Sequence, residues 1–350
     1  MLILSAQKAL KTQIGDLKKV ERAINFFIKS KKNFKISFIY YDRPNQFCTK
    51  PLKRKKPTSI RNFVQQIERR WGIIDYLLLL GGDRVVPFFR LKNPCDDSDK
   101  EVISDSPYAS KDDDFLIPER VCARIPDNQS SDFIIQQLKK SNSFQDVFGL
   151  SARVWKRASE NVYKQIGNKK DLMTSPPITS ARFKSQWLKN KRFLYFNVHG
   201  SKVSPNWYGQ DGSNYPIALS PDNINGASGI VASEACYGAY IINKNNMNSI
   251  SLKFLSELRI LGFCGSTTIA YGPAVPPSSE ADLMVKYFFE YLNQGLNLGE
   301  SFKNAKLDFA RKAIRRHGFL DDDDQKTLLQ FVLYGDPTLR LKPKKGGKRC

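Results

Sequence analysis

Residues 193–201 read FLYFNVHGS, and this stretch decides the fold. Its first part, up to Val198, is almost wholly apolar or aromatic, a pattern typical of a strand buried on both faces of a parallel sheet. His199 and Gly200 follow at once, so we expect the histidine at the carboxyl end of that strand. Open α/β sheets bind their ligands at these ends. The stretch therefore predicts an α/β fold with a histidine at a binding edge.

A second stretch repeats this arrangement. Residues 229–239 read GIVASEACYGA, in which a short apolar run is followed by Cys236. Consecutive parallel strands are usually neighbours, so His199 and Cys236 should meet at one edge of the sheet. An imidazole beside a thiol can activate it as a nucleophile, and the backbone N–H groups of Gly200 and Cys236 could hold an oxyanion. The two stretches predict catalysis by a Cys-His dyad.

A structural role for either residue is the simpler explanation when each is taken alone, since a cysteine at a strand end is usually a small core residue. The chain has only two histidines and six cysteines, however, and one of each falls at equivalent ends of successive strands. This paired placement favours catalysis over coincidence.

Strand and helix patterns alternate along the rest of the chain. Such alternation predicts a mostly parallel sheet with crossover helices. In the first half we expect strands at 1–6, 34–41 and 73–80 and helices at 8–29 and 58–70. In the second half we expect helices at 155–166, 181–191, 249–258, 279–294 and 299–316 and strands at 192–198, 229–234 and 261–270.

A chain of 350 residues has room for two packed units. We place their boundary near Phe144, where the strand pattern restarts. This gives a non-catalytic N-terminal α/β subdomain at 1–144 and a catalytic subdomain at 145–343. Residues 344–350 form a basic tail that we expect to be disordered.

Charge suggests a different class of function. Lysine and arginine outnumber aspartate and glutamate by 56 to 34, which gives a formal net charge of +22. Such a field attracts nucleic acids, and the acidic cluster Asp112 to Asp114 could hold a divalent ion, so a basic nucleic-acid-binding protein or nuclease is an alternative. Against it, the charge is spread along the chain, and no zinc finger, RNA-binding aromatic motif or basic recognition helix is present.

Cysteine spacing and hydropathy bear on the compartment. None of the cysteines forms a C-x-x-C pair, so we expect neither a zinc site nor a disulfide framework, and no cofactor. The longest apolar run, at 76–80, is far shorter than the roughly 20 residues that span a membrane. The first residues lack the basic segment and cleavage site of a secretory signal. We therefore expect a cytoplasmic protein without membrane contact.

At these residues the sequence resembles the gingipain family of the caspase-like cysteine peptidases, whose members carry His-Gly after one strand and Ala-Cys after the next. The match continues in order over almost the whole chain. Its segments are DYLLLLGGD (75–83), SDSPYA (104–109), VCARIPD (121–127), NVHGS (197–201), SEACYGA (233–239) and LYGDPTLRL (333–341). The resemblance implies a caspase-like three-layer αβα sandwich, built as two adjacent α/β subdomains, and a cysteine endopeptidase acting on protein substrates.

The resemblance also implies roles in specificity. Gingipains carry a helper acid in the loop after the first strand of the second unit, but that loop here reads SARVW (151–155), so no third catalytic residue is assigned. Relatives mostly cleave after basic residues, so we expect cleavage after Lys or Arg. Asp211, in the glycine-rich segment after the histidine, is a candidate partner for that charge, and Tyr271 resembles an aromatic residue of the pocket. Arg153 could instead turn the pocket toward acidic side chains.

The resemblance also has implications for regulation and metal binding. Gingipains are secreted behind a signal peptide and a propeptide, and neither is visible here, which suggests an intracellular enzyme controlled by a protein partner or by processing. Gingipains also bind calcium, which here would bind at acidic turns, although Asp321 to Asp324 is better explained as a helix N-terminus. Because folds outlive their chemistry, an inactive caspase-like interaction module is a further alternative.

Overall fold

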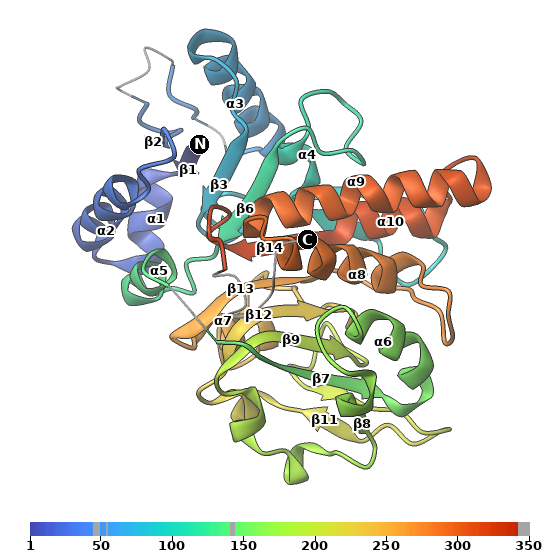
Figure 1. The fold of residues 1–350 in the computed structure, drawn as a ribbon. Coiled ribbons are helices and arrows are strands. Elements are labelled where there is room, and N and C mark those ends of the chain that lie inside the picture. Colours follow the sequence, from blue (N-terminus) through green and yellow to red (C-terminus); the bar gives the residue numbers. More distant parts are fainter. Residues whose placement is uncertain (45–49, 54, 141–143, 342–350) are drawn as a thin grey trace.

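A single large sheet forms the centre of the molecule. The computed structural model describes residues 1–44, 50–53, 55–140 and 144–341 (Figure 1). The strands of the large sheet are β1 (Leu2–Ser5), β2 (Ser37–Tyr40), β3 (Tyr76–Leu80), β6 (Val121–Ile125), β7 (Asp146–Ala152), β8 (Met173–Ser175), β9 (Lys191–Asn197), β12 (Ser228–Ser233), β13 (Arg259–Ser266) and β14 (Phe331–Gly335). They form a ten-stranded sheet in the order β2-β1-β3-β6-β14-β13-β12-β9-β7-β8.

The sheet is mostly parallel. Every neighbouring pair is parallel except β13 and β14, which are antiparallel. Two small antiparallel pairs accompany it, β4 (Phe89–Lys92) with β5 (Glu101–Ser104) and β10 (Trp207–Tyr208) with β11 (Ile217–Leu219). The predicted α/β class and mostly parallel sheet are confirmed.

Helices cover both faces of the sheet, as Figure 1 shows. They are α1 (Gln7–Ile14), α2 (Leu17–Ser30), α3 (Pro57–Trp71), α4 (Ser106–Ala109), α5 (Ser131–Leu138), α6 (Lys156–Tyr163), α7 (Ile250–Ser256), α8 (Glu280–Asn293), α9 (Leu298–His317) and α10 (Asp322–Gln330). Within the described part of the chain, no helix combines the length and the apolar character that crossing a bilayer requires.

The continuous apolar run of β9 reflects burial on both faces. Alternate side chains point to opposite faces of a strand. Phe193 and Tyr195 belong to one hydrophobic core and meet Phe289 of α8. Leu194 and Phe196 belong to the other core, where Phe196 meets Phe254 of α7. The sequence pattern that defined this strand is therefore the signature of a middle layer.

The last strand of the chain joins the two halves. β14 lies between β6 and β13, parallel to the first and antiparallel to the second. The strands from β2 to β14 consequently run in one direction, and those from β13 to β8 run in the other. The predicted boundary near Phe144 falls between α5 and β7, where the second set of strands begins. The predicted tail at 344–350 lies outside the described residues.

Several predicted helices have different limits. The predicted helix at 8–29 is two helices, because Gly15 adopts a left-handed φ of 76° and the Asp16 side chain accepts a hydrogen bond from the Lys19 N–H to begin the next helix. The helix predicted at 181–191 is wrong. Two short 3₁₀ turns stand there, and they bury Phe183 and Leu188 in the core without a continuous helix.

A buried arginine ties together three of the sequence motifs of the first half. Arg124 on β6 forms a bidentate ion pair with Asp105, with Nε–Oδ2 and Nη2–Oδ1 distances of 2.9 and 2.5 Å. Its Nη1 also donates to the carbonyl oxygens of Gly81 and Val86, at 2.8 and 2.6 Å. The guanidinium lies 3.9 Å from the centre of the Phe88 ring. Every polar group of Arg124 is therefore engaged far from water.

We expect Arg124→Met to destabilise the protein by about 3–5 kcal/mol, because it leaves the Asp105 carboxylate buried without its partner. Equilibrium urea unfolding followed by circular dichroism measures the change. The control is Arg311→Met on α9, which removes an exposed ion pair with Asp308 and should shift the midpoint little. Equally small losses of unfolding free energy in both variants would contradict this structural role of Arg124.

Candidate functional site

The two predicted site residues follow neighbouring strands. β9 and β12 pair in parallel, with Phe196 opposite Ser233, and the Glu234 N–H continues the ladder to the Phe196 carbonyl at 2.9 Å. Beyond this point the segments that follow the two strands are in contact. A Cβ at Gly200 would lie 2.0 Å from the Cys236 carbonyl oxygen, so no other residue fits there without moving the backbone. The structure thus brings the ends that carry His199 and Cys236 together.

The His199 ring is held on several sides. Its backbone forms a bridge to Tyr208, with hydrogen bonds of 2.8 and 2.9 Å. The imidazole packs against Trp155 at a ring-centre distance of 4.3 Å, and the edge of Tyr215 approaches at 5.2 Å. Its Nε2 contacts Oε1 of Gln210 at 2.8 Å. Gln210 was not singled out in the sequence.

The contacts of Gln210 specify the tautomer of the histidine. The amide nitrogen donates to the Gly212 carbonyl at 3.0 Å and to the Tyr215 hydroxyl at 2.9 Å. A carbonyl oxygen can only accept, so this orientation of the amide presents Oε1 to the imidazole. The Nε2 of His199 must then carry the proton and donate it. Its Nδ1 consequently keeps a lone pair and can act as a base.

Burial opposes charge on both members of the pair. It lowers the pKa of His199, against the smaller, raising effect of the hydrogen bond that His199 donates to Gln210. Burial likewise raises the pKa of the Cys236 thiol, although the Ala270 N–H donates to Sγ at 3.3 Å and works in the other direction. Both shifts favour a neutral thiol and a neutral imidazole at rest. A resting thiolate–imidazolium pair is disfavoured.

Two backbone donors stand near the thiol. The N–H groups of Gly200 and Cys236 donate no hydrogen bond to another residue of the described chain. Unused N–H groups beside a nucleophile are the usual components of an oxyanion hole. The role of these two amides as oxyanion donors stays a prediction.

A small pocket opens beside Cys236. Trp155 and Tyr271 line it together with the thiol, and two acidic residues, Glu234 and Asp282, line it as well. The predicted position of Tyr271 at the pocket agrees with this lining. Glu234 stands two residues before the cysteine in an otherwise apolar run, a signal that sequence reasoning missed. Asp282 comes from α8, and nothing in its local sequence marks it.

The two acids form a buried carboxyl pair. Glu234 is 6% and Asp282 1% exposed. Burial and repulsion from Asp282 raise the pKa of Glu234, and burial also raises that of Asp282. The raised pKa values favour the protonated acids, and Glu234 Oε1 and Asp282 Oδ2 have no hydrogen-bond partner among the described residues. The pair can therefore accept a cationic or hydrogen-bond-donating ligand.

The other specificity candidates lie elsewhere. Arg153 and Asp211 form an ion pair of 2.9 Å between Nη1 and Oδ2, and their side chains are 58% and 46% exposed. Neither lines the pocket beside Cys236. The Asp211 carboxylate, which we expected to bind the substrate, thus pairs with Arg153, and each side chain neutralises the charge of the other.

The acidic turns are used by the protein itself. Asp321 caps α10 in a capping box with Asp324. In the cluster at 112–114, Asp113 pairs with Arg61 and the Asp112 carboxylate accepts the Asp114 N–H. Among the described residues, no group of three or more His, Cys, Asp or Glu side chains could hold a metal ion. These residues do not fit a calcium site.

Known proteins match this chain along almost its whole length. The model of peptidase family C25 matches residues 6–342. The crystal structure of the Arg-specific cysteine proteinase gingipain R is similar, with 12% identity and a TM-score of 0.67 over 97% of this chain and 78% of that chain. The complex of Porphyromonas gingivalis RgpB pro- and mature domains gives 12% and 0.66 over 97% and 79%. No curated protein matches.

We expect the titration of His199 to report its hydrogen bond. Its imidazole should titrate below the ordinary value of 6.5. Gln210→Glu should raise the pKa, because a carboxylate at this position favours the imidazolium, and Gln210→Met should lower it further. Carbon-edited NMR of the two imidazole signals measures both changes, with His317→Ala to assign them. An unchanged titration in Gln210→Glu would disprove the contact.

Proposed function

Because the chain belongs to peptidase family C25 and is a cysteine-type endopeptidase, we propose that Cys236 and His199 are its catalytic pair. The observation that carries this proposal is the contact of Gly200 with the Cys236 carbonyl, which joins the two strand ends. Membership in a peptidase family argues against the nuclease and against the inactive module as accounts of the whole chain. Proteins are its substrate class.

The proposed reaction uses each group at a stated step. Nδ1 of His199 removes the thiol proton as Sγ of Cys236 attacks the peptide carbonyl carbon, and the N–H groups of Gly200 and Cys236 bind the oxyanion that forms. The imidazolium then protonates the leaving amine, and a thioester remains. His199 next takes a proton from water, whose oxygen attacks the thioester. Collapse of this second intermediate releases the acid, and the proton returns to sulfur.

The pKa directions support general-base catalysis. A resting ion pair requires the pKa of the imidazole to lie above that of the thiol, and burial moves the two in the opposite directions. The proton therefore moves during the attack itself. Gln210 orients the ring for this transfer, but as a neutral amide it stabilises the imidazolium less than a carboxylate would. Gln210 thus orients the His199 ring, as a third catalytic residue would.

We propose cleavage after Lys or Arg, with Glu234 and Asp282 rather than Asp211 as the acids that meet the substrate. A cationic side chain entering the pocket can pair with the two carboxyl groups and take the place of the protons that burial favours on them. An acidic side chain would instead add a third carboxyl group to a buried pair, which is strongly unfavourable. The pairing of Arg153 with Asp211 leaves that arginine engaged at the surface.

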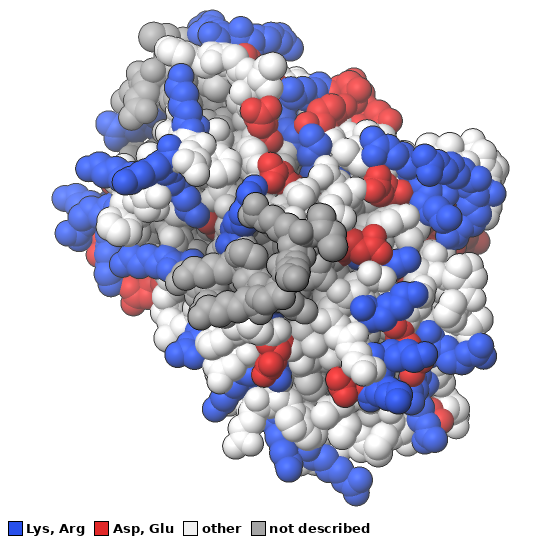
Figure 2. Space-filling model, in the orientation of Figure 1, with Lys and Arg blue, Asp and Glu red and all other residues white. Residues whose placement is uncertain are grey.

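We propose that the enzyme is cytoplasmic and that a protein partner or proteolytic processing controls its activity. The solved complex of pro- and mature domains of a similar protein supports the proposal of control by a bound protein segment. Basic side chains are spread over the surface in Figure 2, and Arg311, Lys312, Arg315 and Arg316 are exposed on α9, so an acidic partner is favoured over a basic one.

Cys236→Ala should lower peptidase kcat/KM by at least about 10³-fold without unfolding the protein, because it removes the nucleophile. A fluorogenic peptide with Lys or Arg before the scissile bond, assayed after activation, measures the loss. The matched control is Cys122→Ala, on a buried thiol of β6, which lies three strands away from β12 in the sheet. Wild-type turnover by Cys236→Ala would refute the assignment.

Glu234→Gln and Asp282→Asn should each lower kcat/KM for substrates cleaved after Lys or Arg by about 10- to 100-fold, because each removes one carboxylate from the cation. Profiling on a mixed peptide library gives the preference directly. Asp211→Asn is the control and should leave the preference unchanged. Dominant cleavage after Asp, lost in Arg153→Ala, would transfer the specificity role to Arg153.

A further inference from the structure

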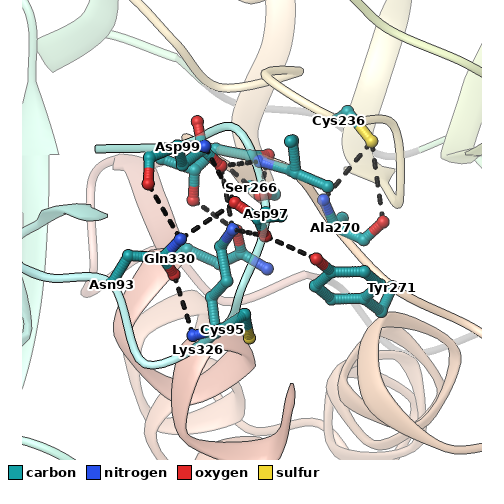
Figure 3. A network of polar contacts seen from close by, with 12 residues as sticks. Asn93, Cys95, Asp97, Asp99, Cys236, Ser266, Ala270, Tyr271, Lys326 and Gln330 are labelled. Atoms are coloured by element: carbon teal, nitrogen blue, oxygen red, sulfur yellow. Dashed lines mark hydrogen bonds and ion pairs between the residues drawn. The ribbon is translucent and has the colours of Figure 1, made fainter. Parts of the chain in front are cut away.

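A loop of the first half reaches the nucleophile. The connection between β4 and β5, residues 93–100, lies next to the Cys236 edge in Figure 3. Hydrogen bonds within the loop brace it. Asn93 Nδ2 donates to Asp97 Oδ1 and to the Asp99 carbonyl, both at 2.9 Å, and the Asp99 N–H donates to Asp97 Oδ1 at 2.8 Å. The loop therefore presents two carboxylates in a defined geometry.

Asp99 binds the chain on both sides of the thiol. Its carboxylate accepts from the Ile269 N–H at 2.8 Å, one residue before the Ala270 N–H that donates to Sγ. It also accepts from the Tyr237 hydroxyl at 2.6 Å, one residue after Cys236. Tyr237 has a φ of 55°, a left-handed conformation that costs roughly 1–2 kcal/mol for a residue with a side chain. Asp99 thus holds a strained turn and its facing segment together.

Asp97 fixes the neighbouring pocket wall. Its carboxylate accepts from the hydroxyl of Tyr271, the aromatic residue that lines the pocket (Figure 3). One loop consequently contacts residues 237, 269 and 271, which surround the thiol and the entrance for the substrate side chain. No motif in the sequence links this loop to the catalytic half.

One lysine pairs with both carboxylates and offsets their repulsion. Lys326 on α10 is fully buried, and its Nζ pairs with Asp97 and, at 2.8 Å, with Asp99. Two buried carboxylates without this cation would repel each other and lose solvation. The charges act on the thiol in opposite directions: beyond the effects of burial and the Ala270 bond, Asp99 raises the pKa of Cys236 and Lys326 lowers it.

We propose that Asp99 and Lys326 are positioning residues for Cys236, which hold the thiol between Tyr237 and Ala270 and set the charge around it. The geometry assigns the β4–β5 loop to the active site although it belongs to the first half of the chain. This inference rests on the proposed nucleophile and adds the parts that keep it in place.

The test uses Asp99→Asn, Lys326→Met and Tyr237→Phe. Each should lower kcat by about 10- to 100-fold with a smaller change in KM, because a displaced nucleophile affects the chemical step. The second readout is the pH dependence of alkylation of Cys236 by iodoacetamide, followed by mass spectrometry. Its midpoint should move to lower pH in Asp99→Asn and to higher pH in Lys326→Met. Tyr237→Phe should leave the midpoint in place, since it removes no charge.

The controls separate this inference from its premise. Lys312→Met removes an exposed lysine of α9 and should change neither readout. Alkylation needs no peptidase activity, so opposite shifts with full activity in Cys236→Ala would refute the proposed nucleophile while still showing that Asp99 and Lys326 set the charge around Cys236. Shifts in the same direction, or wild-type kcat in Asp99→Asn and Tyr237→Phe, would overturn it. If Lys326→Met does not fold, the two conservative variants still decide the result.

Discussion

The parallel pairing of β9 with β12 is the constraint on which the rest of the site depends. Alternate residues of β9 enter two different cores, so a shift of register by one residue would exchange every buried side chain between them. The core therefore fixes the height at which each strand ends. Beyond those ends, the contact of Gly200 with the Cys236 carbonyl leaves room for no side chain. The relative placement of the strand ends that carry His199 and Cys236 thus follows from hydrophobic packing.

β14 determines which parts of the first half can reach this edge. Because β13 and β14 are antiparallel, the carboxyl ends of β9 and β12 lie on the same side as the amino ends of β14 and β6. The helix that leads into β14 is α10, which carries Lys326, so the reversal of strand direction places a cation at the edge that carries Cys236. The β4–β5 loop pairs with that cation. A two-unit description of the chain conceals this connection.

The fold and the meeting of the two strand ends could be predicted because they depend on local patterns. A run such as FLYFNV has one structural explanation, and consecutive parallel strands place His199 and Cys236 together. Gln210, Asp282 and Asp99 could not be predicted in this way, because each acts through a contact formed only in the folded chain. Glu234 is intermediate, since an acid in a buried strand is unusual in itself. The Asp211 hypothesis stays a prediction, although its carboxylate pairs with Arg153.

The charges around the thiol connect specificity with reactivity. The chain carries a net charge of +22, yet Glu234 and Asp282 line the pocket beside Cys236, and Asp99, which pairs with Lys326, contacts the neighbouring Tyr237. Such surroundings disfavour a thiolate, in agreement with the raised pKa that burial chiefly produces. Under the proposed specificity, a lysine or arginine side chain in the pocket adds a positive charge beside the thiol and favours its ionisation. Occupation of the pocket by a basic residue would then both select the substrate and prepare the nucleophile that attacks it.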